Sequence, residues 1–145
     1  MKITFTKSLA LLLLSASFFT GCSKSETKTK TELLTSKTWT QIALGYDDNL
    51  NWTIESSESF LYSCDKDNVW TFKTNGSLIE DEGSVKCGSA TQWSYNWELS
   101  SDGTKLIWNS RTYTIKTLDS YTLEIYYDYQ SSSGPSRYLR KFTHL

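Results

Sequence analysis

Two of the three cysteines in the sequence have a spacing that suits a disulfide bond. Cys64 and Cys87 frame a segment that contains Asn75-Gly76, the strongest short signal for a β-hairpin. If the hairpin turns on those two residues alone, Cys64 and Cys87 face each other at its open end with Cα atoms roughly 5.5 Å apart, as a disulfide requires. We therefore predict a disulfide bond here. The alternative is a pair of unlinked cysteines that are buried as small apolar side chains.

Residues suited to catalysis are scarce. The single histidine, His144, is the penultimate residue, and the sequence has neither a Gly-x-Ser-x-Gly motif nor a His/Cys cluster with metal-ligand spacing. Asp65 and Asp67 resemble the start of a calcium-binding loop, but position five is Val69 and the required Gly is missing. Paired acidic residues can also hydrolyse glycosides, which stays a third possibility. Otherwise we expect no catalytic residue, no metal and no cofactor.

Aromatic residues are the unusual feature of the composition, with six Trp and nine Tyr. Residues 92–99 alternate between apolar and polar side chains, so Trp93, Tyr95 and Trp97 lie on one face of a strand. We predict that these three side chains form the wall of a ligand pocket, because each offers a large flat surface with one polar group. The alternative is that they only fill the core.

Beyond residue 31 the composition is that of an all-β protein, rich in Thr, Tyr, Trp, Val and Ile. Alternating runs between turn residues predict a short helical turn at 32–36 and strands at 37–46, 52–62, 69–74, 77–81, 92–99, 104–108, 111–117, 121–129 and 137–143. Short connections make neighbouring strands antiparallel, and such a meander loses its exposed edges when it closes. We therefore predict a small antiparallel up-and-down β-barrel of about eight strands over 32–145, wide enough for side chains or one small ligand.

The central hairpin also predicts a register. Asn-Gly favours a two-residue turn of type I′, which needs positive φ at both central residues. With such a turn, Trp70 faces Asp81 and Phe72 faces Ile79.

The first 21 residues are typical of an export signal. Basic residues precede an apolar stretch at 9–19 that is too short to span a bilayer. The segment ends in Phe19-Thr20-Gly21-Cys22, which resembles the lipobox of bacterial lipoproteins. The resemblance implies a signal peptide at 1–21 and an acylated Cys22 at the start of the mature chain. The alternative is an ordinary secretory signal that leaves Cys22 as a free thiol.

The polar segment at 22–31 is expected to be a flexible tether between the lipid and the barrel. Ser23 follows the predicted lipidated cysteine. By resemblance to the sorting rule of Gram-negative bacteria, this favours the outer membrane over the inner membrane. Whether the domain faces the periplasm or the cell surface stays open.

Several short patterns together resemble the lipocalin-like lipoproteins of Bacteroidota. The matching residues are Leu33, Leu34, Trp39, Cys64, Asp67, Asn68, Phe72, Asn75, Gly76, Asp81, Glu82, Gly83, Cys87, Trp97, Leu99, Ser100, Asp102, Gly103 and Leu106. The resemblance covers 32–145 and implies a lipocalin-like barrel that binds small apolar molecules. It also implies that a basic side chain late in the chain stacks on Trp39, for which Arg137 and Arg140 are the candidates.

The charge balance argues against nucleic-acid binding. The chain has 15 basic and 16 acidic residues, a formal net charge of −1, and no basic patch or recognisable motif. We therefore expect a monomeric, non-enzymatic protein, held in the bacterial envelope by its lipid, that binds a small hydrophobic or aromatic ligand. The alternative is an accessory or adhesion module that binds a protein partner or a glycan through its outer surface.

Overall fold

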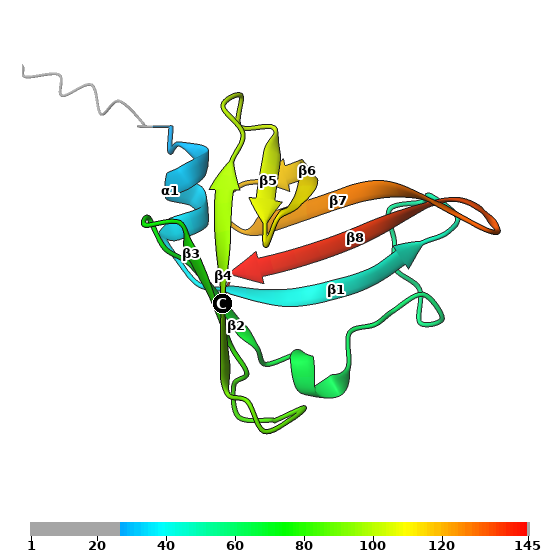
Figure 1. Cartoon of the computed structure of the whole chain (residues 1–145), viewed down its shortest axis with the longest axis horizontal. Helices are drawn as coiled ribbons and strands as arrows, with labels where there is room; N and C mark the ends of the chain where they lie inside the picture. The colour runs from blue at the N-terminus through cyan, green and yellow to red at the C-terminus, as the bar shows by residue number, and fades with distance from the viewer. Residues whose placement is uncertain (1–26, 145) are drawn as a thin grey trace, which may run out of the picture.

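The computed structural model describes residues 27–144. The predicted signal peptide, Cys22, most of the predicted tether and Leu145 lie outside the described residues. In chain order the elements are α1 (Lys30–Thr35), β1 (Trp39–Asp47), the 3₁₀-helix η1 (Ser63–Asp65), β2 (Val69–Phe72), β3 (Ser77–Asp81), β4 (Gln92–Leu99), β5 (Lys105–Trp108), β6 (Arg111–Leu118), β7 (Thr122–Ser131) and β8 (Gly134–His144) (Figure 1). No helix in this part of the chain is long and apolar enough to cross a membrane.

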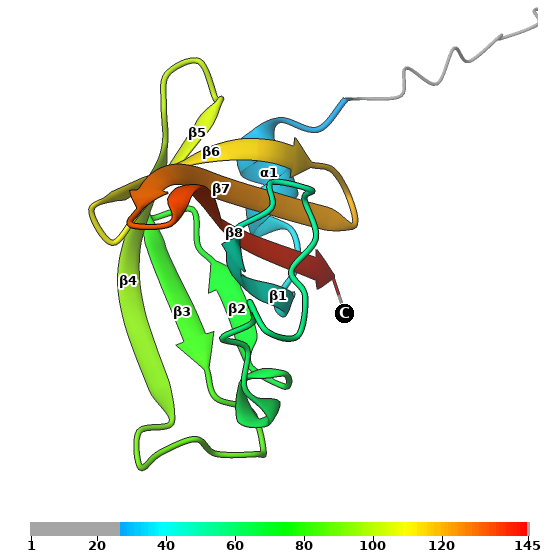
Figure 2. The same cartoon turned by 90° about the vertical axis from the view of Figure 1, so that its right-hand side faces the viewer.

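The strands form a closed antiparallel barrel in which each strand pairs with the next and β8 pairs with β1 (Figures 1 and 2). The closing ladder runs from Trp39 opposite His144 to Asp47 opposite Arg137. Tight turns make this order possible: the turn between β5 and β6 has positive φ at both of its central residues, as a two-residue hairpin turn requires. The predicted up-and-down barrel of eight strands is thereby confirmed.

Helix α1 lies at one end of the barrel (Figure 1). Thr29 caps it, because its hydroxyl accepts a hydrogen bond from the backbone N–H of Glu32 while the Glu32 carboxylate accepts one from the backbone N–H of Thr29. Leu34 is fully buried, and its carbonyl accepts a 2.9 Å hydrogen bond from the indole N–H of Trp39. The helix therefore seals this end of the barrel.

The central hairpin forms, but its predicted register is wrong by one residue. Trp70 lies opposite Glu80, and Phe72 lies opposite Leu78. The connecting loop has three residues instead of two, and within it only Gly76 has a positive φ, of 83°. A type I turn followed by one left-handed residue therefore replaces the expected type I′ turn, and it brings Glu80 onto the inner face of the sheet beside Trp70.

The predicted strand at 52–62 does not form; in the described chain this segment belongs to the loop between β1 and β2. A tight turn precedes it, with positive φ at Leu50 and Trp52, and the buried Asp47 carboxylate accepts a 2.9 Å hydrogen bond from the backbone N–H of Trp52. Trp52 is covered by Arg137, whose guanidinium carbon lies 3.5 Å from the ring centroid. The prediction failed because the chain turns back around the Asp47 carboxylate, after which the segment meets β1 at an isolated bridge between Gly45 and Ser59 and forms no strand.

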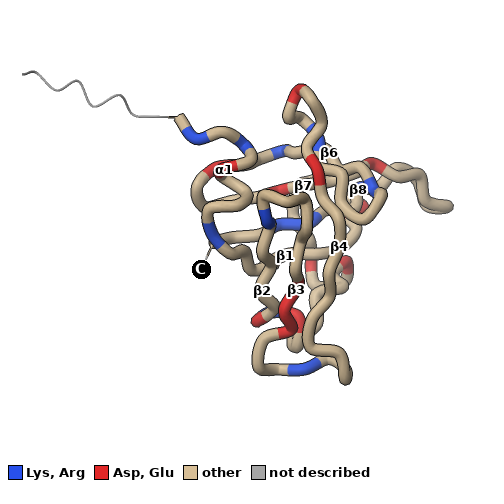
Figure 3. The backbone as a smooth tube through the Cα atoms, turned by 60° about the vertical axis from the view of Figure 1, so that its left-hand side comes forward, with Lys and Arg blue, Asp and Glu red and all other residues tan. Residues whose placement is uncertain are grey.

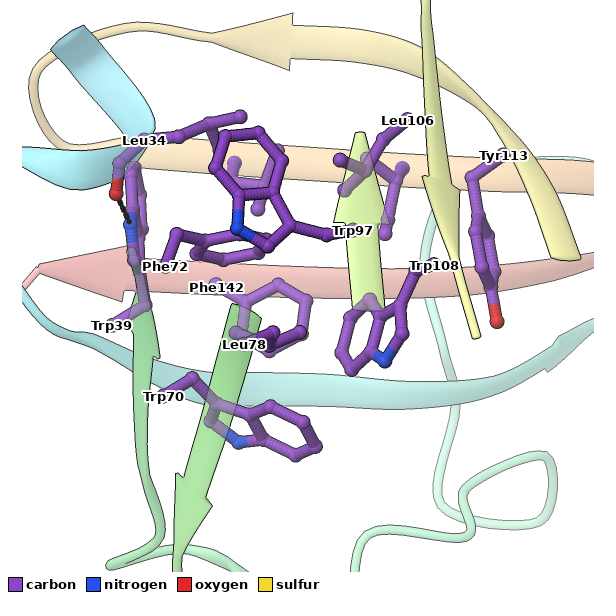
Figure 4. Packing of buried hydrophobic residues seen from close by; sticks show 12 residues of the cluster. Leu34, Trp39, Trp70, Phe72, Leu78, Trp97, Leu106, Trp108, Tyr113 and Phe142 are labelled. Atoms are coloured by element: carbon purple, nitrogen blue, oxygen red, sulfur yellow. Dashed lines mark hydrogen bonds between the residues drawn. The ribbon is translucent and has the colours of Figure 1, made fainter. Parts of the chain in front are cut away.

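The interior next to α1 is filled with side chains (Figure 4). The buried residues of this cluster include Leu34, Trp39, Phe72, Leu78, Trp97, Leu106, Leu123 and Phe142. Several of the aromatic rings meet edge to face: Phe72 and Trp97 have ring centroids 5.3 Å apart and an interplanar angle of 88°. A space large enough for a ligand must therefore lie farther from the helix.

Trp39 has a different stacking partner from the one expected. The imidazole of His144 lies on it, with ring centroids 3.7 Å apart. Neither Arg137 nor Arg140 stacks on Trp39; their guanidinium groups lie over other aromatic rings. The expectation was wrong because His144 is the direct partner of Trp39 in the ladder between β1 and β8.

Candidate functional site

A cavity of about 360 Å³ lies at the part of the barrel away from α1. It is lined by Gln41, Leu44, Asp65, Trp70, Glu80, Tyr95, Trp108, Asn109, Arg111, Tyr113 and Arg140. These residues come from seven of the eight strands and from two of the connections between strands. The volume is within the range of about 300–1,000 Å³ that is usual for small-molecule sites.

The divergence of two strands makes room for this cavity. β1 and β2 pair only where Trp39 meets Trp70 and Thr40 meets Val69. Beyond these positions β1 continues along β8, whereas β2 follows β3 and β4 away from it (Figure 2). The long connection between β1 and β2 crosses this region and contributes Asp65 to the cavity.

Four aromatic side chains form the walls. The rings of Trp70 and Trp108 meet edge to face with centroids 4.9 Å apart, and Figure 4 shows Trp108 between Trp70 and Tyr113. Tyr95 is nearly parallel to Trp70, at an interplanar angle of 17° and a centroid distance of 6.2 Å. The cavity therefore offers flat aromatic surfaces as well as phenolic hydroxyl groups.

Arg140 places a cation among these rings. Its guanidinium carbon lies 4.0 Å from the ring centroid of Trp108 and 5.0 Å from that of Trp70. Its Nη2 donates a 2.9 Å hydrogen bond to the side-chain oxygen of Gln41. No ion pair among the described residues includes Arg140, so the groups in contact with its guanidinium are ring faces and a neutral amide, while the carboxylates of Asp65 and Glu80 line the same cavity without pairing with it.

Two buried polar atoms of the cavity lining lack a hydrogen-bond partner, and both are donors. The Nε–H of Arg140 and the indole N–H of Trp70 are buried and have no hydrogen-bond partner among the described residues. Buried polar groups are nearly always paired in native proteins, so two unpaired donors in one cavity are exceptional. They suit a ligand that carries hydrogen-bond acceptors.

Two acidic residues, Asp65 and Glu80, line the cavity, and the carboxylate of Glu80 already accepts hydrogen bonds from its neighbours. Glu80 belongs to the acidic run that ends β3 (Figure 3), and its two oxygens accept 3.0 Å hydrogen bonds from the side chains of Asn68 and Tyr95. Burial raises the pKa of Glu80 above its ordinary value. Burial and the neighbouring Glu80 raise the pKa of Tyr95 to about 12, so Tyr95 stays a hydrogen-bond donor at neutral pH.

A second cation lies at the edge of the cavity. Arg111 is exposed, and its Nη1 donates a 2.6 Å hydrogen bond to the hydroxyl of Tyr127. Its guanidinium carbon also lies 4.9 Å from the ring centroid of Tyr127. This side chain is therefore held in place while its charge remains in contact with solvent.

The predicted disulfide bond between Cys64 and Cys87 is confirmed, with the Cα atoms 5.3 Å apart. Its setting differs from the prediction, because Cys64 lies in η1 and Cys87 in the loop between β3 and β4. The bond joins the two loops beside the cavity residue Asp65. Cys64, Asp65 and Cys87 are also the one group of possible metal ligands among residues 27–144, but both sulfurs are consumed by the disulfide and supply no thiolate.

Of the three side chains predicted to form a pocket wall, only Tyr95 lines the cavity. Trp97 is buried in the core, where its indole N–H donates a 3.0 Å hydrogen bond to the carbonyl of Lys73. Trp93 is half-buried on β4 opposite Glu80 and lies outside the cavity lining. A ligand-binding role for any of the three stays a prediction.

Sequence reasoning missed most of the cavity. Trp70, Trp108 and Arg140 lie on strands that the sequence predicts, but nothing in the sequence shows that they meet across the barrel. Arg140 was considered only as a partner of Trp39. The signal that could have found them is the alternation within their own strands, which puts each of them on the inner face.

No protein-family model and no curated protein matches this sequence. Among the solved structures that are similar is the complex of bovine odorant binding protein with undecanal, at 15% identity and a TM-score of 0.45, covering 84% of this chain and 77% of that chain. Another is the complex of the same protein with a selenium-containing odorant, at 13% identity and a TM-score of 0.44, covering 84% and 76%. By its own strand pairing the present chain is a closed antiparallel barrel of eight strands. At these scores the similarity supports no conclusion about a ligand.

Proposed function

We propose that this protein is a non-enzymatic binding protein that holds a small aromatic or hydrophobic molecule in the barrel cavity. The observation that carries the proposal is the cavity itself, which lies beyond a filled core and is walled by Trp70, Trp108 and Tyr95. Aromatic walls with a few polar groups are typical of sites that bind small molecules. The proposal takes the barrel to act as a monomer.

The proposal also places the protein on a membrane. The sequence around Cys22 supports lipid attachment, and Cys22 lies outside the described residues. The helix cap Thr29 follows it closely, so an acylated Cys22 would keep the barrel near the bilayer. We propose the outer membrane of a bacterium of the Bacteroidota as the location, with the barrel facing the periplasm or the cell surface.

A second candidate function uses the outer surface. Phe60 and Tyr129 are both more than 40% exposed, at 43% and 42%, and both pack on Tyr46 with ring centroids 5.3 and 5.2 Å away. Together with the exposed Leu50 they give the barrel an apolar surface feature near the long β7–β8 hairpin. Such a feature suits a protein or glycan partner, as an accessory or adhesion module would need.

Mass spectrometry distinguishes these proposals. The full chain is produced in a bacterium, purified from membranes in a mild detergent, and measured under native and denaturing conditions. Added mass that is lost on denaturation supports binding in the cavity and identifies the class of ligand. A native mass equal to the polypeptide with its lipid argues for the surface function. The denatured mass also tests lipid attachment, since Cys22→Ala should remove both the acyl mass and the membrane association.

A further inference from the structure

The cavity contains a half-buried cation, Arg140, that forms no ion pair with the acidic residues of the lining, Asp65 and Glu80. The guanidinium of Arg140 lies among the rings of Trp70, Trp108 and Phe142, with ring centroids 5.0, 4.0 and 5.3 Å from its central carbon. Its hydrogen bond to Gln41 is made to a neutral group. A buried charge is costly unless it is paired and its hydrogen bonds are made, so a bound anion would compensate a cost that the protein alone leaves in place.

The distribution of unpaired atoms points in the same direction. Two residues of the cavity lining have buried polar atoms without a partner, and both atoms are N–H donors, on Arg140 and Trp70. The unpaired buried acceptors of the described chain belong to residues outside the lining. These two donors therefore suit a molecule that brings hydrogen-bond acceptors.

We propose that the cavity binds a small aromatic carboxylate, with its carboxylate group on Arg140 and its ring against the tryptophan and tyrosine side chains. The inference rests on the proposed function and specifies the chemistry of its ligand. Arginine and a carboxylate match in geometry as well as in charge. The exposed cation of Arg111 at the edge of the cavity adds attraction for an anion as it enters.

The size of the site favours a compact ligand over a long acyl chain. Toward α1 the barrel is closed by Phe72, Leu78 and Phe142, whose side chains are almost completely buried. Leu34 of the helix is also fully buried behind them. A molecule with one or two fused rings suits a cavity of about 360 Å³, whereas an extended chain would have to displace the packed core.

Two acidic residues oppose this ligand. Glu80 and Asp65 both line the cavity, so their negative charges lower the affinity for an anion. For Glu80 the opposition is limited because Asn68 and Tyr95 already donate hydrogen bonds to its two oxygens. Removal of the Glu80 charge should consequently strengthen binding, a gain that damage to the fold would not produce.

The test compares two probes of the same size, one with a charged carboxylate and one with a neutral amide in its place. The full chain, purified from membranes in a non-ionic detergent, is titrated calorimetrically with indole-3-acetate and with indole-3-acetamide. The carboxylate should bind at least about tenfold more tightly than the amide, as expected for a hydrogen bond to a charged group. Equal affinities, tighter binding of the amide, or no binding of either probe would overturn the inference.

Variants assign the preference to the residues. Arg140→Gln should reduce the affinity for indole-3-acetate to the affinity for the amide. Glu80→Gln should raise the affinity for indole-3-acetate by roughly tenfold, which is the size of the effect of one charge several ångströms away at an effective dielectric constant near 20. Lys141→Gln is the matched control, since Lys141 is the next residue of β8, lies outside the cavity lining and pairs with Glu124. Unchanged affinity in both cavity variants would contradict the assignment.

Two further measurements keep the outcomes distinct. If circular dichroism shows that Arg140→Gln does not fold, Glu80→Gln and Trp70→Phe test the inference in its place. Trp70→Phe removes an unpaired donor and should weaken binding of the carboxylate by a few-fold. Native mass spectrometry of the unliganded preparation tests the proposed function separately. A neutral molecule retained in the cavity, together with no preference for the carboxylate, would overturn this inference and leave the binding barrel intact.

Discussion

The imidazole of His144 stacks on the indole of Trp39, with ring centroids 3.7 Å and planes 28° apart. The Nδ1 of His144 also donates a 2.8 Å hydrogen bond to the carbonyl of Thr38. Trp39 begins the first strand and His144 ends the last, and the two residues are direct partners in the ladder that closes the barrel. His144 is therefore a structural part of the barrel.

His144→Ala should destabilise the protein by about 1–2 kcal/mol, through loss of the stacked pair and of one hydrogen bond. Urea denaturation followed by tryptophan fluorescence measures the change. His144→Phe is the matched variant, because it keeps an aromatic ring on Trp39 and loses only the hydrogen bond to Thr38. It should recover part of the lost stability, and a variant His144→Ala as stable as the parent would contradict the role assigned to this contact.

Loss of the disulfide should also lower stability. Cys64→Ser combined with Cys87→Ser removes a bond that restricts the unfolded chain, which costs roughly 3 kcal/mol for a loop of this length. A lower melting temperature of the double variant in thermal denaturation is the expected result. Reductant should lower the melting temperature of the parent toward that of the variant and leave the variant unchanged. If the double variant melts with the parent, the bond contributes nothing to stability.

The strands of the barrel could be predicted because each carries its own signal. Residues 92–99 alternate strictly, and β4 occupies the same range. The segment at 52–62 carried a similar apolar content, yet it became a loop because the Asp47 carboxylate and positive φ at Leu50 and Trp52 fold the chain back before it. Composition alone cannot distinguish a side chain that packs singly on a surface from one that alternates in a sheet.

The cavity could not be predicted, because it depends on register and closure. A loop of three residues where two were expected moved Glu80 opposite Trp70. Arg140 reaches Trp108 only because β8 closes the barrel. These pairings are non-local, and no short pattern in a single sequence encodes them. Tyr95 was found because alternation within one strand is local information.

Glu80 should make the protein less stable as the pH rises. Burial is the main cause that raises its pKa above the ordinary value of 4.5, and the charge of Asp65 adds to it, while Asn68, Tyr95 and Arg140 act in the opposite direction. Above pH 4.5 the unfolded chain releases a proton that the folded chain still holds. The stability linked to Glu80 is therefore complete below that pH and is lost as the pH rises through the raised pKa.

Glu80→Gln removes this titration. The free energy of unfolding of the variant minus that of the parent should increase over the same pH interval, since only the parent loses stability there. Chemical denaturation measures this difference at a series of pH values between about 4 and 8, an interval that covers the range where such a carboxyl titrates. Glu98→Gln, on an exposed residue of the neighbouring strand β4, shows how much of the trend is due to net charge alone. The prediction would be contradicted if Glu80→Gln and Glu98→Gln changed the free energy of unfolding by the same amount at every pH.

Leu34→Ala tests whether α1 seals the barrel. Leu34 is fully buried against the core, so truncation should leave a cavity and cost about 2–5 kcal/mol. Leu33→Ala is the matched control in the same helix, and it should cost clearly less because Leu33 is only partly buried. Both variants keep the backbone carbonyl that accepts the hydrogen bond from Trp39, so denaturation measures packing alone. Equal losses of stability in the two variants would mean that the helix contributes through its length and cap. The expected difference between them would mean that the Leu34 side chain closes this end of the barrel, so that the cavity at the other end is the site for a ligand.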